Sequence, residues 1–569
     1  MTVSLRIPYF IKTMLVILTV ITVIFLRFYK LGSVPQGLTK DEAYYGYDAY
    51  SILKTGKDIW GERLPLRFKS TGEYKLNLTY FMIPGISLFG LTEMTVRLPS
   101  AIFGIFTMYL LFLSLLELNV SANWSIILAV VFGLSPWSFG MSRLFFESNV
   151  GLFFITLSTY ILILKNKQSQ SSLLLASISL AVSAYLYGPY LYIGVFILFL
   201  ALFTKKLKPK FLLTYLIALA PMLYSLSQGG ALTRLTQEWS LKMPGIIMEI
   251  DQARANCYLS FNKNVSLTKV CYLFWNKPIL IIKEISIVTL RLLAPNYLFF
   301  QSSNHYILPD SYGAYSIVVL PLYFLSMLGF TTIAQKKKEV ISRINQLLLI
   351  TLISTLVVAV AGRVEIYRNP VGLYTLFLVI ATITYHYIYT ILLKSKLLGM
   401  SLIIIFISIA SFNTTKYLLE YFTSYTNFYP LTFSSDSKEV YKYLANYRDY
   451  DAIIDLKFHG PIYAAFYWKI DPAYFQKNIH WADPDPWGWI NARKVANVYS
   501  TETTLNALLC KKAADPSKQL RTLIISDPEP RYSPYAVYAT YDFTHALHLH
   551  DIYDIDLLYS NIDNKTICK

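Results

Sequence analysis

The chain has 569 residues, of which 55% are hydrophobic and only 15% are charged. Soluble domains carry about 25% charged residues, so this composition excludes an ordinary soluble protein and indicates a polytopic membrane protein. The formal net charge is +17, but residues 1–415 hold 35 Lys and Arg against 16 Asp and Glu, whereas residues 416–569 hold 16 against 18. The basic excess lies among the apolar segments, where membrane orientation explains it without a nucleic-acid partner.

The first apolar run covers residues 8–28 and predicts the first membrane span. Lys12 and Arg27 lie near its ends, where long basic side chains can reach the interface. No small-residue cleavage site follows the run, so we expect an anchor rather than a removed signal peptide.

Residues 30–97 form a charged and aromatic loop after this span. We expect two short helices along the membrane surface, at 43–55 and at 78–90, because the second is apolar but too short to cross a bilayer. The loop begins with two adjacent carboxylates, Asp41 and Glu42. A carboxylate pair beside a bilayer is costly unless it is hydrated or matched to a cation, so the pair indicates a functional site, with an ordinary hydrated loop pair as the alternative.

Ten more apolar runs predict further spans. They lie at 98–116, 118–142, 148–164, twice within 168–204 with a break at Gly188-Pro189, and at 211–233, 314–335, 344–362, 369–393 and 397–415. The predicted fold class is therefore a polytopic α-helical membrane protein of about 11 spans over residues 1–415, followed by a C-terminal α/β domain.

The basic residues of the short connections predict the orientation. With a cytoplasmic N-terminus, the inner segments hold fourteen basic residues, from Arg6 to Lys396, and the acids near them are Glu117 and Glu339. This places three regions outside the cell membrane: the first outer loop 30–97, the second outer loop 234–312 and the tail after 415.

The tail, 416–569, has short apolar runs such as DAIIDL and RTLIIS, which Pro, Asp and aromatic residues interrupt. This pattern predicts a soluble extracytoplasmic domain, and its length suffices for one folded unit. All four cysteines fall in predicted outer segments, where the natural disulfides are Cys257 with Cys271 and Cys510 with Cys568. Four unpaired thiols are the alternative.

The predicted outer face offers the parts of a transferase that uses a lipid-phosphate-linked sugar, since no nucleotide sugar is available there. One carboxylate must accept the proton of the acceptor hydroxyl, and Asp41 is our candidate, with Glu42 as its orienting neighbour or as an acceptor ligand. The departing phosphate needs cations, for which the candidates are Lys75, Arg143, Arg234 and Arg368.

Three further residues are predicted to support this site: Tyr44, Glu73 and Glu147. Glu147 follows Arg143 by four residues, so on one helix the two would share a face and could form either a catalytic or a structural ion pair. Arg368 has a second interpretation as an interfacial anchor. No cofactor is certain, and a divalent metal is conceivable because Glu73 could contribute a ligand.

Three segments of the chain resemble one known family. They are DEAYYGYDAYSILKTGKDIWGERLPL at 41–66, FGLTEMTVRLPSAIFG at 89–104 and SPWSFGMSRLFFESN at 135–149. In this order they resemble bacterial members of the protein O-mannosyltransferase family, glycosyltransferase family 39. That family has the C-type glycosyltransferase fold, which it shares with the aminoarabinose transferase that modifies lipid A.

The resemblance implies sugar transfer from a polyprenyl-phosphate carrier with inversion at the anomeric carbon. It matches Asp41 to the catalytic Asp of the first loop, Glu42 to its neighbour and Arg143 to the Arg of the second outer loop. Lys75 occupies the position where relatives carry Lys followed by two prolines, but the sequence here is KLNL. The region around Arg368 lacks the His-x-x-Arg form of some members.

We therefore expect a multi-pass glycosyltransferase that moves a sugar from a polyprenyl-phosphate donor to an acceptor protein, lipid or glycan outside the membrane. The alternative from another class is a transporter or flippase of a lipid-linked sugar, which would place charges near the bilayer midplane. A third interpretation makes the tail a binding module on an inactive scaffold. Membrane lipids are expected partners, and nucleic acid is not.

Overall fold

The computed structural model describes residues 9–65, 68–69, 79–204, 208–227, 244–260, 265–301, 307–309, 311–360, 368–391, 396–424, 434–457, 460–483, 490–500, 505–541 and 548–561. The chain divides into two compact units. The membrane unit comprises Met1–Arg27, Ser100–Ser142 and Phe146–Tyr417. The loop unit comprises Phe28–Pro99, Arg143–Phe145 and Leu418–Lys569, so the predicted first outer loop groups with the C-terminal tail.

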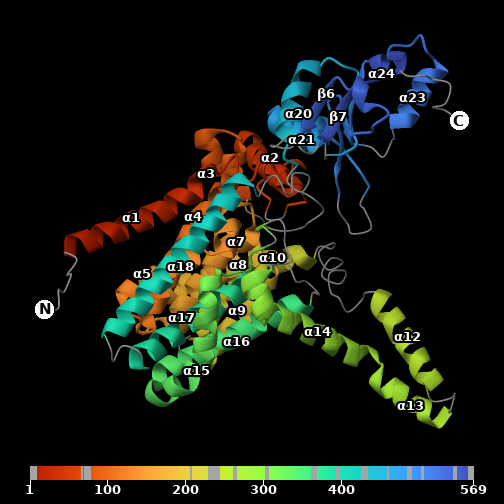
Figure 1. The fold of residues 1–569 in the computed structure, drawn as a ribbon. Coiled ribbons are helices and arrows are strands. Elements are labelled where there is room, and N and C mark those ends of the chain that lie inside the picture. The colour runs from red at the N-terminus through yellow and green to blue at the C-terminus, as the bar shows by residue number, and fades with distance from the viewer. Residues whose placement is uncertain are drawn as a thin grey trace. The chain divides into compact units, whose positions relative to one another are not determined.

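Long helices make up the membrane unit (Figure 1). Their bounds are α1 Tyr9–Phe28, α4 Glu93–Glu117, α5 Ala122–Gly133, α6 Pro136–Arg143, α7 Glu147–Thr159, η2 Tyr160–Leu164, α8 Gln170–Leu186, α9 Pro189–Phe203, α10 Pro209–Ser227, α12 Pro244–Ser260, α13 Val265–Phe274, α14 Lys277–Leu293, η4 Asn296–Phe300, η5 Ile317–Val319, α15 Leu320–Lys336, α16 Lys338–Val360, α17 Pro370–Ile391 and α18 Lys396–Thr423. Helix α8 packs against α7, α9 and α10. Helix α17 packs against both α15 and α16.

Within the described residues, four helices are long and apolar enough to cross a membrane: Glu93–Glu117, Glu147–Leu164, Lys338–Val360 and Pro370–Ile388. A fifth crossing results if α5 and α6, which meet at 61°, form one broken span. Every predicted span coincides with a helix or a helix pair. Several of these helices, however, are too short in the structure to count as membrane-crossing helices. The chain is thus a mostly helical, multi-pass membrane protein, while the number of 11 spans stays a prediction.

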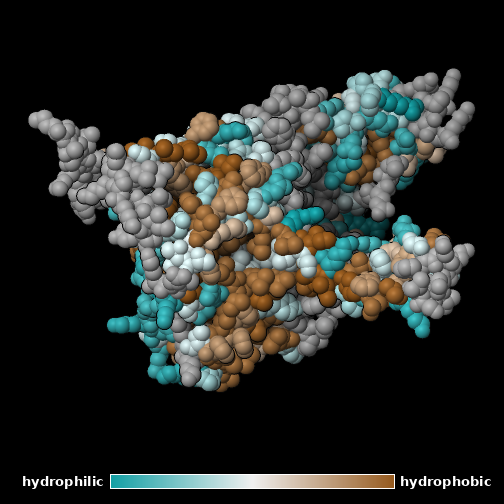
Figure 2. All heavy atoms as spheres, turned by 60° about the horizontal axis from the view of Figure 1, so that its bottom comes forward, coloured by the Kyte–Doolittle hydropathy of each residue, from teal (hydrophilic) through white to brown (hydrophobic). Residues whose placement is uncertain are grey.

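Hydrophobic side chains cover much of the helical surface in Figure 2, as expected for helices whose outward faces meet lipid. Local sequence ends these helices where it was predicted to do so. Helix α8 stops before Tyr187, and Pro189 begins α9 at a position where its missing N–H costs nothing. The second outer loop was expected as a loop, but it contains the helices α12, α13 and α14.

The structure joins Cys257 to Cys271 in a disulfide between α12 and α13, with the two Cα atoms 5.9 Å apart. Cys510, on α23, is also disulfide-bonded. Its predicted partner, Cys568, lies outside the described residues.

The loop unit contains the remaining helices and a seven-stranded sheet. Its helices are α2 Lys40–Thr55, α3 Thr79–Phe89, α20 Ser437–Leu444, η8 Ala445–Tyr447, α21 Gly460–Tyr467, α22 Pro472–Asn478, α23 Leu505–Ala514, η9 Ser533–Tyr535 and α24 Ile555–Asn561. Its strands are β1 Ala452–Asp455, β2 His480–Trp481, β3 Ala492–Val495, β4 Val498–Ser500, β5 Thr522–Ser526, β6 Tyr538–Tyr541 and β7 His548–Asp554.

The strand order is β2-β3-β4-β1-β5-β7-β6, in which β1 runs parallel to β4 and β5 while the other pairs are antiparallel. Strand β5, in the interior of the sheet between β1 and β7, is buried along its whole length, as a strand covered on both faces should be. Helix α21 packs on β3 and β4, and α24 packs on β5 and β7. The predicted α/β tail is confirmed, as are the two short helices of the first loop, which the structure places at 40–55 and 79–89.

Candidate active site

The start of helix α2 holds the predicted carboxylate pair in a capping box. Thr39 is the N-cap, and its side chain accepts a hydrogen bond from the backbone N–H of Glu42 at 3.3 Å. The Glu42 carboxylate accepts the backbone N–H of Thr39 in return, at 2.9 Å. This reciprocal pair fixes the first turn of the helix, in which Asp41 is the second residue and Glu42 the third. At the other end Gly56, with φ 70°, adopts the left-handed conformation that terminates α2.

Glu42 is buried and forms an ion pair with Arg97, the buried arginine of α4. The contact is bidentate, with Arg97 Nε 2.8 Å from Glu42 Oε1 and Arg97 Nη2 3.1 Å from Oε2. The backbone N–H of Phe145 also donates to Oε1, at 3.3 Å. Both carboxylate oxygens are thus occupied by protein donors. This arrangement fits the orienting role predicted for Glu42 and does not fit the predicted alternative of an acceptor ligand, which would need a free oxygen.

Arg97 also shapes the chain that leads into α2. Its Nη1 donates to the carbonyl oxygens of Leu31 at 3.3 Å and Pro35 at 2.6 Å, and its Nη2 donates to that of Gly37 at 2.6 Å. Together with the two bonds to Glu42, these acceptors satisfy the five N–H groups of the guanidinium. One arginine therefore holds the 31–37 segment, the first turn of α2 and the start of α4 together.

Arg143, at the end of α6, contacts the same segment. Its Nη2 donates to the carbonyl oxygen of Val34 at 2.9 Å. Its guanidinium lies 4.8 Å from the ring centre of Phe422 and 5.5 Å from that of Tyr421, both on α18. Arg143 is buried in this setting, so the aromatic rings compensate part of the cost of removing its charge from water. The 31–37 segment thereby brings Arg143 into the vicinity of the Glu42–Arg97 pair.

Asp41 is exposed, in contrast to its buried neighbour. At the second position of α2 it lies beside N–H groups that have no partner within the helix, and this location favours the charged carboxylate. Tyr44 lies one turn further along α2 and is buried. Burial raises the pKa of the Tyr44 hydroxyl, and the negative charges of Asp41 and Asp48 raise it further. The site thus presents one accessible carboxylate on a rigid, mostly buried helix.

The C-terminal domain supplies much of that rigidity. Two tyrosines reach across between α2 and this domain: Tyr463 donates to the carbonyl oxygen of Leu38, and Tyr47 donates to that of Ile470, each at 2.8 Å. The backbone N–H of Ala492, on β3, donates to the Tyr44 hydroxyl oxygen, also at 2.8 Å. The tail therefore contacts α2 at its start and at its middle, and Tyr44 supports the site through a strand of the tail.

Close packing accompanies these hydrogen bonds. A Cβ atom at Gly46 would lie 2.6 Å from Val96 of α4 and 2.9 Å from Phe466 of α21, so α2 approaches both elements at a position that admits only glycine without rearrangement. On α22, the Gln476 amide donates to Ser51, Thr55 and the carbonyl oxygen of Asp58 at 2.9–3.1 Å. Both ends of α2 are thus held against the tail.

The turn after α2 contains a second buried carboxylate. Asp58 Oδ1 accepts the backbone N–H groups of Trp60 at 3.0 Å and Glu62 at 2.8 Å. Burial raises the pKa of Asp58 to about 6 in spite of these two hydrogen bonds. Trp60 stacks on Trp481 of β2 with ring centres 3.8 Å apart, which attaches this turn to the sheet.

The structure says less about the other predicted site residues. Glu73, Lys75 and Arg234 lie outside the described residues. Arg368 belongs to the membrane unit, where its carbonyl oxygen accepts the Tyr187 hydroxyl at 3.2 Å. Glu147 is the first residue of α7.

Arg143 and Glu147 do not lie on one helix. The prediction that they share a face applied only to a single continuous helix. Instead α6 ends at Arg143, Phe146 is extended with φ −136° and ψ 121°, and α7 begins at Glu147. The chain therefore has a break between the two residues, and helical spacing does not relate their side chains.

Arg97 is the site residue that sequence reasoning missed. Two signals point to it. Thr39 and Glu42 have the T-x-x-E spacing of a capping box, which marks Glu42 as the third residue of a helix rather than a loop residue. Arg97 is also a charge in the first turns of an otherwise apolar span, and such a charge needs a partner of opposite sign.

No group of three or more His, Cys, Asp or Glu side chains suited to a metal ion occurs in the part of the chain that the structure describes. The candidate ligand Glu73 is not part of it.

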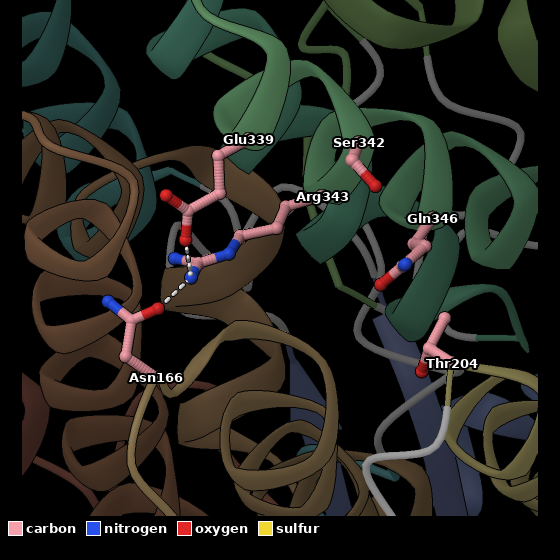
Figure 3. Close-up of a pocket in the computed structure, with 6 residues that line it drawn as sticks. All are labelled: Asn166, Thr204, Glu339, Ser342, Arg343 and Gln346. Carbon is pink, nitrogen blue, oxygen red and sulfur yellow. Dashed lines mark hydrogen bonds and ion pairs between the residues drawn. The ribbon is translucent and has the colours of Figure 1, made fainter.

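The pocket in Figure 3 belongs to the membrane unit and contains none of the predicted site residues. It has a volume of about 240 Å³ and is lined by Asn166, Thr204, Glu339, Ser342, Arg343 and Gln346. Arg343 donates to Asn166, to Glu339 at 2.8 Å and to the carbonyl oxygen of Glu117 at 2.7 Å. Because protein acceptors already surround this guanidinium, we do not assign the pocket to the donor phosphate.

One protein family matches the N-terminal part of the chain. Residues 16–234 match the model of the dolichyl-phosphate-mannose-protein mannosyltransferase family. This match confirms the resemblance of the three sequence segments to the protein O-mannosyltransferases. The matched range includes Asp41, Glu42, Arg97 and Arg143, so the whole capped and ion-paired start of α2 lies inside it.

Individual proteins are similar over different lengths. An uncharacterized protein of Aquifex aeolicus (strain VF5) is 30% identical over 149 residues, which are 26% of this chain and 28% of that protein. ArnT from Cupriavidus metallidurans bound to undecaprenyl phosphate has a TM-score of 0.43 at 10% identity, covering 95% of this chain and 98% of that chain. The oligosaccharyltransferase of Archaeoglobus fulgidus in the apo form has a TM-score of 0.44 at 10% identity, and the match covers 91% of this chain and 70% of that chain.

Proposed function

We propose that this protein is a membrane glycosyltransferase of the C-type fold, which moves a sugar from a polyprenyl-phosphate carrier to a hydroxyl acceptor on the outer side of the cell membrane. The observation that carries the proposal is the start of α2, where an exposed Asp41 adjoins the buried Glu42–Arg97 ion pair. This constellation lies within the region that matches the mannosyltransferase family.

In the proposed reaction Asp41 acts as general base. Its carboxylate takes the proton of the acceptor hydroxyl while the hydroxyl oxygen forms a bond to the anomeric carbon of the sugar. The bond between that carbon and the phosphate oxygen breaks, and its electron pair leaves with polyprenyl phosphate. Attack opposite the leaving group inverts the anomeric carbon. Because the phosphate is already a good leaving group, the reaction needs no second carboxylate as an acid.

The negative charge on the departing phosphate requires cations. Arg97 is committed to Glu42 and three carbonyl oxygens, which supports a positioning role for this arginine instead of a phosphate-binding role. Lys75, Arg143, Arg234 and Arg368 are the proposed phosphate ligands. Arg143 donates to Val34 through Nη2, so a second guanidinium nitrogen would have to serve the phosphate.

The decisive variant is Asp41→Asn, which keeps the shape of the side chain and removes the base. We expect kcat to fall by about 10²–10⁴-fold, the usual contribution of a general base, with unchanged insertion into the membrane. The measurement is acceptor-dependent release of polyprenyl phosphate by the purified protein in lipid. Asp251→Asn, on an exposed residue of α12, is the matched control and should retain full activity.

Full activity in the Asp41→Asn variant would contradict the proposal. The same assay separates a transferase from a transporter of lipid-linked sugar. A transporter would move the donor across the bilayer without cleaving it, so no polyprenyl phosphate would be released, with or without an acceptor.

A further inference from the structure

The second outer loop folds into a helical arm, which we define as α12, α13 and α14. Figure 1 shows α14 leading away from α15 and α16, with α12 and α13 at its far end. The Cys257–Cys271 disulfide ties α12 to α13. Arg254, on α12, donates from Nε to the carbonyl oxygen of Trp275 at 2.7 Å and lies 4.7 Å from the ring centre of Tyr272. The arm is therefore an ordered structure with its own covalent and polar connections.

The arm has a small core and a large apolar surface. Ile250 and Leu280 form its buried hydrophobic cluster. Eleven large hydrophobic or aromatic side chains of its described residues are exposed: Met248, Tyr258, Leu259, Val270, Tyr272, Leu273, Phe274, Ile279, Ile282, Ile287 and Leu290. So many exposed apolar side chains on one short segment would be unfavourable in water, and they indicate an apolar partner for the arm.

The exposed residues of α14 have a specific pattern. Ile279, Ile282 and Leu290 recur at helical spacing, and they are 41%, 63% and 69% exposed. Exposed Lys283 and Arg291 lie beside them. A helix of this kind, whose exposed surface carries large apolar side chains together with long basic ones, is typical of one that lies in the membrane interface. The helix cannot cross the bilayer, because Lys283 and Glu284 would occupy its middle.

The position of the arm in the chain identifies the partner. It is inserted between the apolar helices α10 and α15, and α14 packs against α16, which is a candidate membrane span. In Figure 2 hydrophobic surface extends along the helices of this unit. The rings of Tyr258, Tyr272 and Phe274 suit the depth of the lipid head groups, where aromatic residues gather. Exposed Lys269, Lys277, Lys283 and Arg291 suit anionic head groups.

From these observations we infer that the arm is an interfacial membrane anchor. Its exposed apolar side chains insert into one leaflet, and Lys269, Lys277 and Arg291 extend to the phosphates of the lipid head groups. Lys283 is paired with Glu249 within the arm. The disulfide keeps α12 and α13 together, so that their exposed side chains enter the lipid as one surface. This role depends on the membrane location of the chain and not on the proposed transfer reaction.

The test is photo-crosslinking of the full-length protein in vesicles of phosphatidylethanolamine and phosphatidylglycerol. The photoreactive residue p-benzoylphenylalanine replaces Phe274, which is 57% exposed in the arm, or Tyr535, which is 40% exposed in the C-terminal domain. We expect illumination to attach phospholipid to the protein at position 274 and not at position 535, as detected by mass spectrometry. Absence of lipid at position 274, or attachment of another polypeptide in its place, would overturn the inference.

A second measurement avoids the bulky probe. Trp275 lies between α13 and α14. The difference between the tryptophan fluorescence of the wild type and that of the Trp275→Phe variant gives the emission of Trp275, here called the Trp275 share. We expect brominated phospholipids to quench this share more strongly than they quench the remaining tryptophan emission of the variant. Equal or weaker quenching of the Trp275 share would show that the end of α13 is not in lipid and would likewise overturn the inference.

Discussion

Asp41 and Glu42 are adjacent in the chain, but their carboxylates have opposite environments. Position within the first helical turn accounts for the difference. Glu42 is the third helical residue, so its side chain returns to the N-cap and meets Arg97. Asp41 is the second, and its side chain is exposed. A pair that the sequence presents as two equivalent acids is therefore one buried, ion-paired carboxylate and one exposed carboxylate.

Asp58 provides a prediction on pH at the residue scale. Its pKa is about 6 in the folded protein and is raised from 3.8 by burial. The folded state thus binds more protons than the unfolded state between these values, and this group makes the protein less stable as the pH rises from about 4 to about 6. The Asp58→Asn variant keeps an oxygen for the N–H groups of Trp60 and Glu62, but it does not titrate.

We expect unfolding temperatures of the detergent-solubilised protein to show this contribution as a fall across that pH interval, and the fall should be smaller in Asp58→Asn. Asp471→Asn is a suitable control, since Asp471 is an exposed N-cap that accepts a backbone N–H in the same unit. Identical pH profiles for wild type and Asp58→Asn would show that Asp58 does not titrate in this way.

At the scale of elements, the ion pair between α2 and α4 holds the site together. Arg97→Leu leaves the Glu42 carboxylate buried without its cation, which typically costs about 3–5 kcal/mol. Adding Glu42→Gln removes the stranded charge and keeps the capping box, so the double variant should recover part of the loss. Chemical unfolding in detergent measures the free energy of unfolding of the single and of the double variant.

Lys283→Leu is the corresponding control on the surface. Lys283 lies 3.4 Å from Glu249, and both side chains are about half exposed, so breaking this pair should cost at most about 1 kcal/mol. An equally small effect of Arg97→Leu would contradict the structural role of the buried pair.

For the whole molecule, the loop unit shows that the C-terminal domain is part of the site's scaffold. A chain that stops after residue 424 keeps the membrane helices but lacks Tyr463, Gln476 and the backbone of β3, all of which bond to α2 or to Leu38 just before its cap. We expect the shortened protein to insert into the membrane and to lose transfer activity by at least about 10²-fold, since small displacements of catalytic groups have effects of that size.

Point variants in α22 refine this experiment in the complete chain. Gln476→Ala removes the three hydrogen bonds to the end of α2 and to the turn after it, and we expect reduced transfer. Asn478→Ala removes a bond from Asn478 to Tyr474 on the same short helix and should leave transfer unchanged. Full activity of the shortened chain would show that α2 keeps its geometry without the tail.

The sequence by itself determined the membrane class, the α/β tail, the short helices of the first loop and the resemblance to the protein O-mannosyltransferases, because each depends on local composition, periodicity or motif. It also indicated Asp41 and the Cys257–Cys271 pair. Only the tertiary structure decided that Glu42 meets Arg97, that Arg143 and Glu147 lie on separate helices, and that the tail holds α2. These facts depend on contacts between residues far apart in the chain, such as Leu38 with Tyr463, and local patterns carry no information about such pairings.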